Sequence, residues 1–406
     1  MKRKSGNLEY HLLLLVTLGL TAFGLVMVYS ASSGRAAVAS GDPAYYLKRQ
    51  ALYAALGLVA LAFLSRVKFR SLRYAGGPLL LGSIGLLVAV LVMGTAVNGA
   101  RRWLSLGLID FQPSELAKLA VVLWIAGLLA RRPAPATLSE LAKPIGLTVL
   151  AVCALVLAEP DLGTAIAIIL TVSAMLVVAG TPMRVLGSAA GIVVTLALAA
   201  IWLEPYRRER LLAFLDPWSD SEGAGFQTVQ ALIALGSGGF FGVGLGESVQ
   251  KINFLPESTT DMILAIVGEE LGLIGVTAVI VAFAVFAYAG LTVAARTKDP
   301  FGKLVAAGLT TLVAGQAVVN LAAVLGLAPL TGIPLPFVSY GGSSLLVGLA
   351  AVGILLNIAS NDGVAATDRV PDRSRGNGRT RPAVAGRGRR AAPPRRQRPV
   401  RRRAAG

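Results

Sequence analysis

The chain has 406 residues, of which 55% are hydrophobic and 15% charged, with a formal net charge of +17. An ordinary soluble domain has about 25% charged residues, so this chain has too few polar residues to coat soluble domains, and most of it must face lipid. A single cysteine, Cys153, excludes a disulfide framework, and a single histidine, His11, excludes histidine metal sites and Ser-His-Asp triads. Any chemistry must use carboxylates, Lys, Arg, hydroxyls and backbone groups.

Ten segments are apolar enough for membrane-spanning helices, each of which needs roughly 20 mostly apolar residues. We expect an all-α polytopic membrane protein with helices at about 12–34, 46–64, 76–97, 114–130, 144–158, 163–181, 185–203, 262–289, 304–326 and 343–359. The first segment is longer than the apolar region of a signal peptide, so we expect it to be retained. This gives a short N-terminus at 1–11, a membrane domain at 12–360 with a large loop at 204–261 between the seventh and eighth helices, and a tail at 361–406.

The last two predicted helices come from residues 304–361, which contain no charged residue. We divide this stretch at 327–342, where three prolines and three glycines would interrupt a helix. Lipid cannot satisfy the backbone of a non-helical segment at membrane depth. We therefore expect 327–342 to be a structured loop buried among helices.

Basic residues concentrate in alternate loops. With ten helices, the segments at 65–73, 131–143 and 296–303 fall on the same side as both termini, and the positive-inside rule places that side in the cytoplasm. The segments on the outer side are 35–45, 98–113, 159–162, 204–261 and 327–342. Arg101-Arg102 and Arg207-Arg208 lie outside against this rule, which indicates a local task such as binding an anion.

The tail at 361–406 contains 14 arginines and three acidic residues. It has no apolar periodicity, so we expect it to be disordered. Its charge favours contact with anionic lipid of the inner leaflet, with docking of a partner as the alternative. We expect no nucleic-acid binding, because the tail offers neither aromatic stacking nor a folded reader.

The large loop contains a glycine-rich segment, Gly236–Gly246, with six glycines. It matches neither the dinucleotide-binding pattern nor the phosphate-binding loop, so a nucleotide site is not supported. Two interpretations remain open, namely close backbone packing and contact with substrate.

Two carboxylates, Glu257 and Asp261, come directly before the predicted helix at 262–289. They are four residues apart and would face the same way on a helical turn. We expect one of the three preceding hydroxyl residues to cap the helix, namely Ser258, Thr259 or Thr260. The carboxylates are either chemical groups of a site or residues that favour the helix dipole.

Burying a charge in lipid costs free energy, so an ionisable residue in a membrane span is a candidate functional residue. Six such residues lie inside or at the edges of the predicted spans: Glu115, Lys118, Glu159, Asp161, Glu269 and Glu270. Glu115 and Lys118 are three residues apart and can pair. Glu269 would point into one wet groove with Asp261 or form an ion pair between helices, and for Glu270 we expect the ion pair. Trp103 is either an interfacial residue or a surface on which a sugar stacks.

Seven strings in this chain order together resemble the SEDS family of polytopic membrane proteins, over residues 10–360. They are NGARRWL (98–104), FQPSELAK (111–118), EPDLGT (159–164), GLGESVQK (244–251), LPESTTD (255–261), GEELG (268–272) and PLPFVSYGGS (334–343). The stretch GESVQK (246–251), before LPE (255–257), is more similar to the cell-division branch of the family than to the elongation branch.

The resemblance implies a peptidoglycan glycosyltransferase that polymerises lipid II by β-1,4 transfer at the outer face of the plasma membrane, at the division septum. It also implies a class B penicillin-binding protein as the crosslinking partner, with other divisome proteins, and it makes Asp261 the catalytic residue. We expect substrate binding by Arg101, Arg102, Trp103, Glu115, Lys118, Asp161, Lys251, Glu257, Ser339 and Tyr340. Assistance by a divalent cation, Mg²⁺ or Mn²⁺, is left open by this chemistry, and Glu257 or Asp261 could supply its carboxylate ligands.

Two other functions fit parts of the pattern. A lipid II flippase would also use intramembrane charges and helices broken by Pro and Gly, and a non-catalytic scaffold would only recruit the synthase. A flippase needs ionisable groups along its whole path, whereas here they crowd the outer half and the outer loops. The sequence therefore favours the glycosyltransferase.

Overall fold

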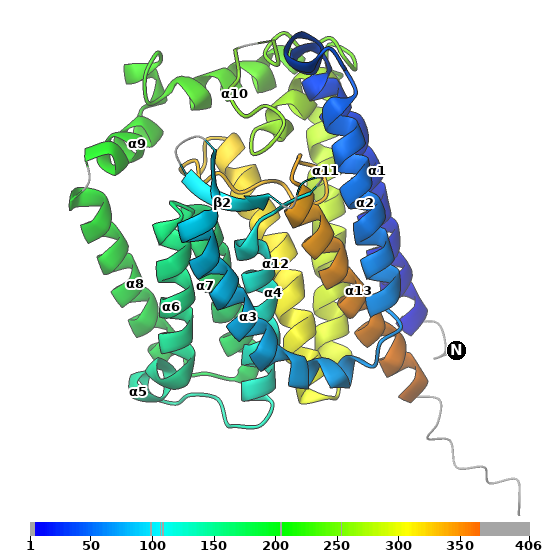
Figure 1. Cartoon of the computed structure of the whole chain (residues 1–406), viewed down its shortest axis with the longest axis vertical. Helices are drawn as coiled ribbons and strands as arrows, with labels where there is room; N and C mark the ends of the chain where they lie inside the picture. Colours follow the sequence, from blue (N-terminus) through cyan, green and yellow to red (C-terminus); the bar gives the residue numbers. More distant parts are fainter. Residues whose placement is uncertain are drawn as a thin grey trace, which may run out of the picture. The chain divides into compact units, whose positions relative to one another are not determined.

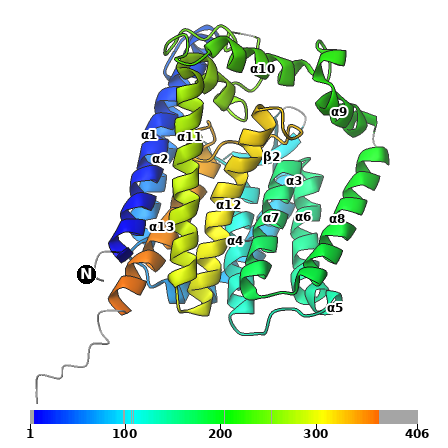
Figure 2. The ribbon, with the colours of Figure 1, turned by 180° about the vertical axis from the view of Figure 1, so that it is seen from behind.

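The computed structural model describes residues 5–365 except 98, 99, 106, 108, 204 and 253. The arginine-rich tail was predicted to be disordered, and its residues from 366 on lie outside the described range. Long helices dominate the described part and run side by side (Figures 1 and 2). They are α1 (Ser5–Ser40), α2 (Tyr45–Leu64), α3 (Leu72–Met93), α4 (Pro113–Leu129), α6 (Leu147–Ala158), α7 (Leu162–Ala179), α8 (Met183–Leu203), α11 (Ile263–Arg296), α12 (Pro300–Val324) and α13 (Gly342–Ala365).

The predicted all-helical polytopic fold is confirmed, and each of the ten predicted segments corresponds to one of these helices. In the described residues, eight helices are long and apolar enough to cross a membrane. Of the other two, α4 has 17 residues, and α8 has 21 residues, of which the continuous stretch with described side chains, Met183–Ala199, is apolar. Several predicted boundaries were wrong by four residues or more, because α1 spans Ser5–Ser40, α3 ends at Met93, α11 continues to Arg296 and α13 continues to Ala365.

The short elements lie at the two ends of the helices. The end that we call the loop side carries α9 (Pro205–Leu215), η3 (Pro217–Asp220), α10 (Phe226–Gly238) and a sheet of β1 (Thr95–Val97), β2 (Ala100–Ser105) and β3 (Asp110–Phe111). The other end, which we call the terminal side because α1 begins there, carries η1 (Phe69–Ser71), α5 (Leu138–Leu141) and η2 (Ala142–Gly146). The region predicted as a loop at 204–261 therefore contains two helices and a 3-10 turn.

The sheet has the order β1-β2-β3 with antiparallel pairs. The register places Thr95 opposite Trp103 and Ala96 opposite Arg101, so Arg102 is the extra residue of a bulge. Bulges re-aim side chains and increase the local twist. The sheet was not predicted from the sequence.

The absence of charge in 304–361 follows from burial in protein. The spans of α12 and α13 are 67% and 83% buried, against 28–50% for the other spans. Glycines allow these helices to approach their neighbours closely: a Cβ on Gly353 would lie 2.6 Å from the Leu61 carbonyl oxygen, and one on Gly308 would lie 2.8 Å from the Met175 sulfur. The two helices thus form the centre of the bundle.

The glycine-rich segment packs its backbone against a break in α11. Gly272 interrupts this helix with φ +66° and ψ −162°. Across the break, Val243 N and Gly244 N donate to the carbonyls of Glu269 and Glu270, and Leu273 N donates to the carbonyl of Gly239. A Cβ on Gly272 would lie 2.4 Å from Gly242 N. Of the two open interpretations, close backbone packing is the one these contacts support.

Ser221 follows η3 on the loop side, and Ser139 lies in α5 on the terminal side. The arrangement predicts that these two residues lie on opposite sides of the membrane. In a Cys153→Ala background, Ser221→Cys and Ser139→Cys should react with a membrane-impermeant thiol reagent from opposite sides of sealed cells. Labelling of both from the same side would contradict the helix count between them.

Candidate functional site

The predicted site residues gather on the loop side from segments that are far apart in the sequence. They come from β2, the first turn of α4, the turn between α6 and α7, the turn before α11, and the segment between α12 and α13. Apart from β2, each of these segments ends or begins a helix at the same end of the bundle. The site is therefore built from helix ends held together by contacts between loops.

Asp261 lies in a turn and not in the helix that follows. The N-cap of α11 is Met262, which makes no side-chain capping hydrogen bond, so the prediction that Ser258, Thr259 or Thr260 caps the helix was wrong. Glu257 has a left-handed φ of +52°, which few non-glycine residues adopt. Its carbonyl accepts Thr260 N at 3.0 Å and Met262 N at 3.2 Å, and this closes the turn.

The two carboxylates of this turn meet at one hydroxyl. Thr260 Oγ1 donates to Glu257 Oε2 at 2.7 Å. Asp261 Oδ1 lies 3.4 Å from Thr260 Oγ1. Glu257 is exposed and Asp261 is half-buried. Among the described residues there is no group of three or more His, Cys, Asp or Glu that could hold a metal. A cation bound here would therefore need ligands from substrate or water.

Donors from outside also hold this turn. Asn320, from α12, donates its Nδ2 to the carbonyl of Asp261 at 2.7 Å and to that of Ile333 at 2.8 Å. Tyr340 N donates to the carbonyl of Thr259 at 2.8 Å. Sequence reasoning missed Asn320. Its signal was available, because it is an amide in a stretch of 58 residues without charge.

The segment at 327–342 was predicted to be buried, and this is confirmed for its second half only: Leu335 and Val338 are 1% and 0% exposed, whereas Leu327 is 74% exposed. Ser339 is also buried, and its Oγ accepts the Leu335 N–H at 2.8 Å, so this hydroxyl holds the segment together. Tyr340 packs edge-on against Tyr46 with ring centroids 5.0 Å apart. Burial raises the pKa of the Tyr340 phenol to about 12, so its hydroxyl stays a neutral donor.

The cations of β2 have different surroundings. Arg101 is exposed, whereas Arg102 at the bulge donates its Nε to the Glu159 carbonyl at 2.8 Å and a terminal nitrogen to the Pro160 carbonyl. Arg102 therefore ties the sheet to the turn between α6 and α7. Trp103 is half-buried on the same strand.

The carboxyl of Glu159 is fully buried, and neither of its oxygens has a hydrogen-bond partner among the described residues. Burial, and then the charge of Asp161, raises the pKa of Glu159 to about 8. Asp161 has partners, because it caps α7 by accepting Thr164 N at 2.9 Å and the Thr164 hydroxyl at 2.7 Å. Gln112 Nε2 also lies 3.3 Å from Asp161.

The predicted pair in α4 is confirmed. Lys118 Nζ donates to Glu115 Oε1 at 2.9 Å, and both side chains are buried. Each charge is thus compensated by the other, which makes burial at the first turn of α4 tolerable. The pair presents a net neutral group next to the sheet.

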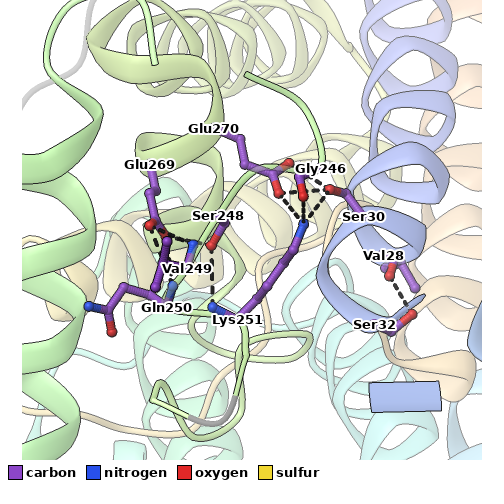
Figure 3. A network of polar contacts seen from close by, with 10 residues as sticks. All are labelled: Val28, Ser30, Ser32, Gly246, Ser248, Val249, Gln250, Lys251, Glu269 and Glu270. Carbon is purple, nitrogen blue, oxygen red and sulfur yellow. Dashed lines mark hydrogen bonds and ion pairs between the residues drawn. The ribbon is translucent and has the colours of Figure 1, made fainter. Parts of the chain in front are cut away.

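Glu269 and Glu270 hold the loop that precedes Asp261 (Figure 3). Glu269 accepts the Ser248 hydroxyl and Val249 N, the latter at 2.9 Å, so its contacts are with this loop and do not join it to Asp261. Glu270 accepts Lys251 Nζ at 2.8 Å and the hydroxyl of Ser30 at 2.6 Å. The expected ion pair of Glu270 is confirmed, although its partner Lys251 comes from the loop and not from another helix, and Lys251 is buried in the pair.

Comparisons with known proteins agree with each other. The family model FTSW_RODA_SPOVE, described as Cell cycle protein, matches residues 10–363. The chain is 44% identical over 354 residues to a probable peptidoglycan glycosyltransferase FtsW of Geobacter metallireducens, covering 86% of this chain and 94% of that protein. It is 39% identical to stage V sporulation protein E of Bacillus subtilis, with 86% and 96% covered.

Solved structures give the same result. A chain from a study of how a peptidoglycan synthase complex coordinates polymerization and crosslinking is similar with a TM-score of 0.73 and 33% identity, covering 86% of this chain and 97% of that one. The rod shape determining protein RodA of Thermus thermophilus is similar with a TM-score of 0.63 and 31% identity, covering 89% and 97%.

The pKa of Glu159 predicts a pH dependence of stability. The folded state binds this proton more tightly than the unfolded state, whose carboxyl has its ordinary pKa of 4.5, so stability should fall as pH rises from about 4.5 to about 8. The thermal midpoint in detergent should therefore fall between pH 6 and 8, and Glu159→Gln should remove that part of the fall. Glu247→Gln, which changes an exposed carboxyl, should retain it. Equal slopes for the parent and Glu159→Gln would contradict the assignment.

The buried Lys251–Glu270 pair predicts a non-additive pair of substitutions. Lys251→Met or Glu270→Met alone leaves an uncompensated buried charge and should cost about 3–5 kcal/mol. The double variant removes both charges and should unfold at a midpoint above either single variant, measured by thermal unfolding in detergent. Additive losses would show that the two side chains do not depend on each other.

Proposed function

Because the chain belongs to the SEDS family, we propose that it is a peptidoglycan glycosyltransferase that polymerises lipid II on the loop side of the membrane domain. In this reaction the 4-hydroxyl of the acceptor sugar attacks the anomeric carbon of the donor, and the polyprenyl pyrophosphate leaves. Inversion at that carbon gives the β-1,4 bond without a covalent intermediate. The reaction needs one base and positive charge near the leaving group.

The observation that carries the proposal is the turn around Asp261. It presents a half-buried carboxylate at a helix mouth, beside the exposed Glu257 and the hydroxyl of Thr260. We assign Asp261 as the general base that takes the proton of the acceptor hydroxyl. Glu257 is assigned to orient the acceptor.

The candidate cations are not equivalent. Lys118 is compensated by Glu115, and the guanidinium of Arg102 is engaged by two carbonyls. Arg101 is exposed on the same strand, so we assign it to bind the departing pyrophosphate. Arg102 adds positive charge next to it without direct contact with the leaving group. Trp103, two residues along the strand, is assigned to the sugar.

A divalent cation fits this turn as a proposal. Mg²⁺ is usually bound by one or two carboxylates together with substrate phosphates, and the turn offers two adjacent carboxylates. Such an ion would neutralise charge on the pyrophosphate. The assigned roles of Asp261 and Arg101 do not depend on it.

The distribution of buried charge favours the enzyme over a flippase. Among the described residues, seven of the eight buried charged side chains lie toward the loop side: Glu115, Lys118, Glu159, Asp161, Lys251, Glu269 and Glu270. The eighth, Glu9, pairs with Arg296 toward the terminal side. A transport path would need ionisable groups through the middle of the membrane domain.

The chain is a multi-pass membrane protein, and we propose that it lies in the plasma membrane with the loop side outside and both termini in the cytoplasm. The similarity to a chain of a peptidoglycan synthase complex supports a class B penicillin-binding protein as partner. We further propose a place at the division septum with other divisome proteins, and contact of the basic tail with anionic inner-leaflet lipid.

Asp261→Asn tests the assignment. The substitution keeps the shape of the side chain and removes its ability to take a proton, and general-base catalysis is worth about 10²–10⁴-fold. Polymerisation of purified lipid II by the protein with its class B partner should fall at least about 100-fold, while lipid II binding and partner association persist. Glu257→Gln should cost less, and the exposed control Glu222→Gln should be unaffected. If Asp261→Asn polymerises within a fewfold of the parent, the base lies elsewhere.

A further inference from the structure

Asn320 is a buried polar residue of α12, with 2% of its surface exposed. Burial of an amide without hydrogen bonds costs free energy that an apolar residue would avoid. Asn320 meets this cost with two donations from one nitrogen, to the carbonyls of Asp261 and Ile333 at 2.7 and 2.8 Å. It therefore joins α12 to both the turn of Asp261 and the segment before α13.

The orientation of this amide follows from its neighbours. Carbonyl oxygens only accept hydrogen bonds, so the Nδ2 of Asn320 must face them, and a flipped amide would place Oδ1 against two acceptors. Oδ1 itself has no hydrogen-bond partner among the described residues. The contacts of the side chain are thus two donations to backbone.

One of these donations is made to the peptide of Asp261 itself. The turn is non-helical and includes the left-handed Glu257, so its position depends on contacts beyond the hydrogen-bond ladder of α11. The other external donor described above is the backbone N–H of Tyr340. Of these two external donors, Asn320 is a side chain and can be removed by a single substitution.

We infer that Asn320 is a positioning residue for the reaction, which holds the backbone of Asp261 so that its carboxylate meets the acceptor hydroxyl. The inference rests on the proposed role of Asp261 as general base. Asn320 acts through Asp261 and needs no contact with substrate. Displacement of a reacting group by about 1 Å can cost about 100-fold in rate.

The chain contains a matched control for this role. Asn357 of α13 is 1% exposed, and its Nδ2 likewise donates to two carbonyls, those of Leu64 and Val67. These carbonyls belong to the last residue of α2 and to the link from α2 to η1, on the terminal side, at the opposite end of the helices from Asp261. Asn357→Leu therefore removes the same chemistry without touching the turn.

The test compares Asn320→Leu with Asn357→Leu in the full chain with its class B partner. For Asn320→Leu, kcat for lipid II polymerisation should fall about 10–100-fold with KM within about threefold of the parent, and for Asn357→Leu kcat should stay within about threefold. Asn320→Gln, which retains the amide, should recover part of the turnover lost in Asn320→Leu.

A second measurement does not depend on activity. Hydrogen exchange of residues 255–264 should accelerate in Asn320→Leu and stay unchanged in Asn357→Leu, because the amides of Thr260 and Met262 are bonded within the turn. If the parent does not polymerise lipid II, the proposed function fails, while the exchange result still tests the positioning contact. Unchanged exchange, or equal losses of kcat in the two leucine variants, would overturn the inference.

Discussion

A lipid bilayer offers no hydrogen-bond partners, and this constraint governs how the non-helical parts of the protein are held. The break of α11 at Gly272 exposes backbone groups that a helix would satisfy internally, and the segment at 239–244 supplies their partners. Side chains obey the same rule, since Glu270 has Lys251 and Ser30, and Glu115 has Lys118. The loop side is thus an interlocked layer in which each segment is held by the next.

The position of Asp261 depends on this layer more than on α11. Its turn is fixed by Asn320 from α12 and by Tyr340 from the next segment, and that segment is fixed in turn by Gln50 of α2, whose Nε2 donates to the Ser339 carbonyl at 3.0 Å. The turn that carries this carboxylate is therefore held by α12 directly and, through the segment before α13, by α2. Such support by rigid elements is what a general base requires, because proton transfer depends on the distance to the acceptor hydroxyl.

The features predictable from the sequence are those encoded locally. Long apolar runs identified the helices, the spacing of three residues identified the Glu115–Lys118 pair, and prolines and glycines identified the buried segment before α13. The sheet, the Gly272 break and the Met262 cap could not be predicted, because tertiary partners decide them. Glu269 shows the difference, since its spacing from Asp261 indicated a shared groove, whereas its actual partners are backbone and hydroxyl groups around Ser248.

The contact between the glycine-rich segment and α11 has a consequence for how freely this part of the chain can vary. The glycine-rich segment and the break in α11 are joined by hydrogen bonds between main-chain atoms. The large side chains of the segment, Phe240 and Phe241, are 70% and 83% exposed. Substitution of these two aromatic residues, for example to fit a membrane surface or a partner protein, would therefore leave the main-chain hydrogen bonds to α11 intact. At Gly238 and Gly242 even a methyl group would overlap the backbone of α11, at 1.9 and 2.2 Å. The segment combines an inner edge that has no room for side chains with an outer surface on which side chains can change.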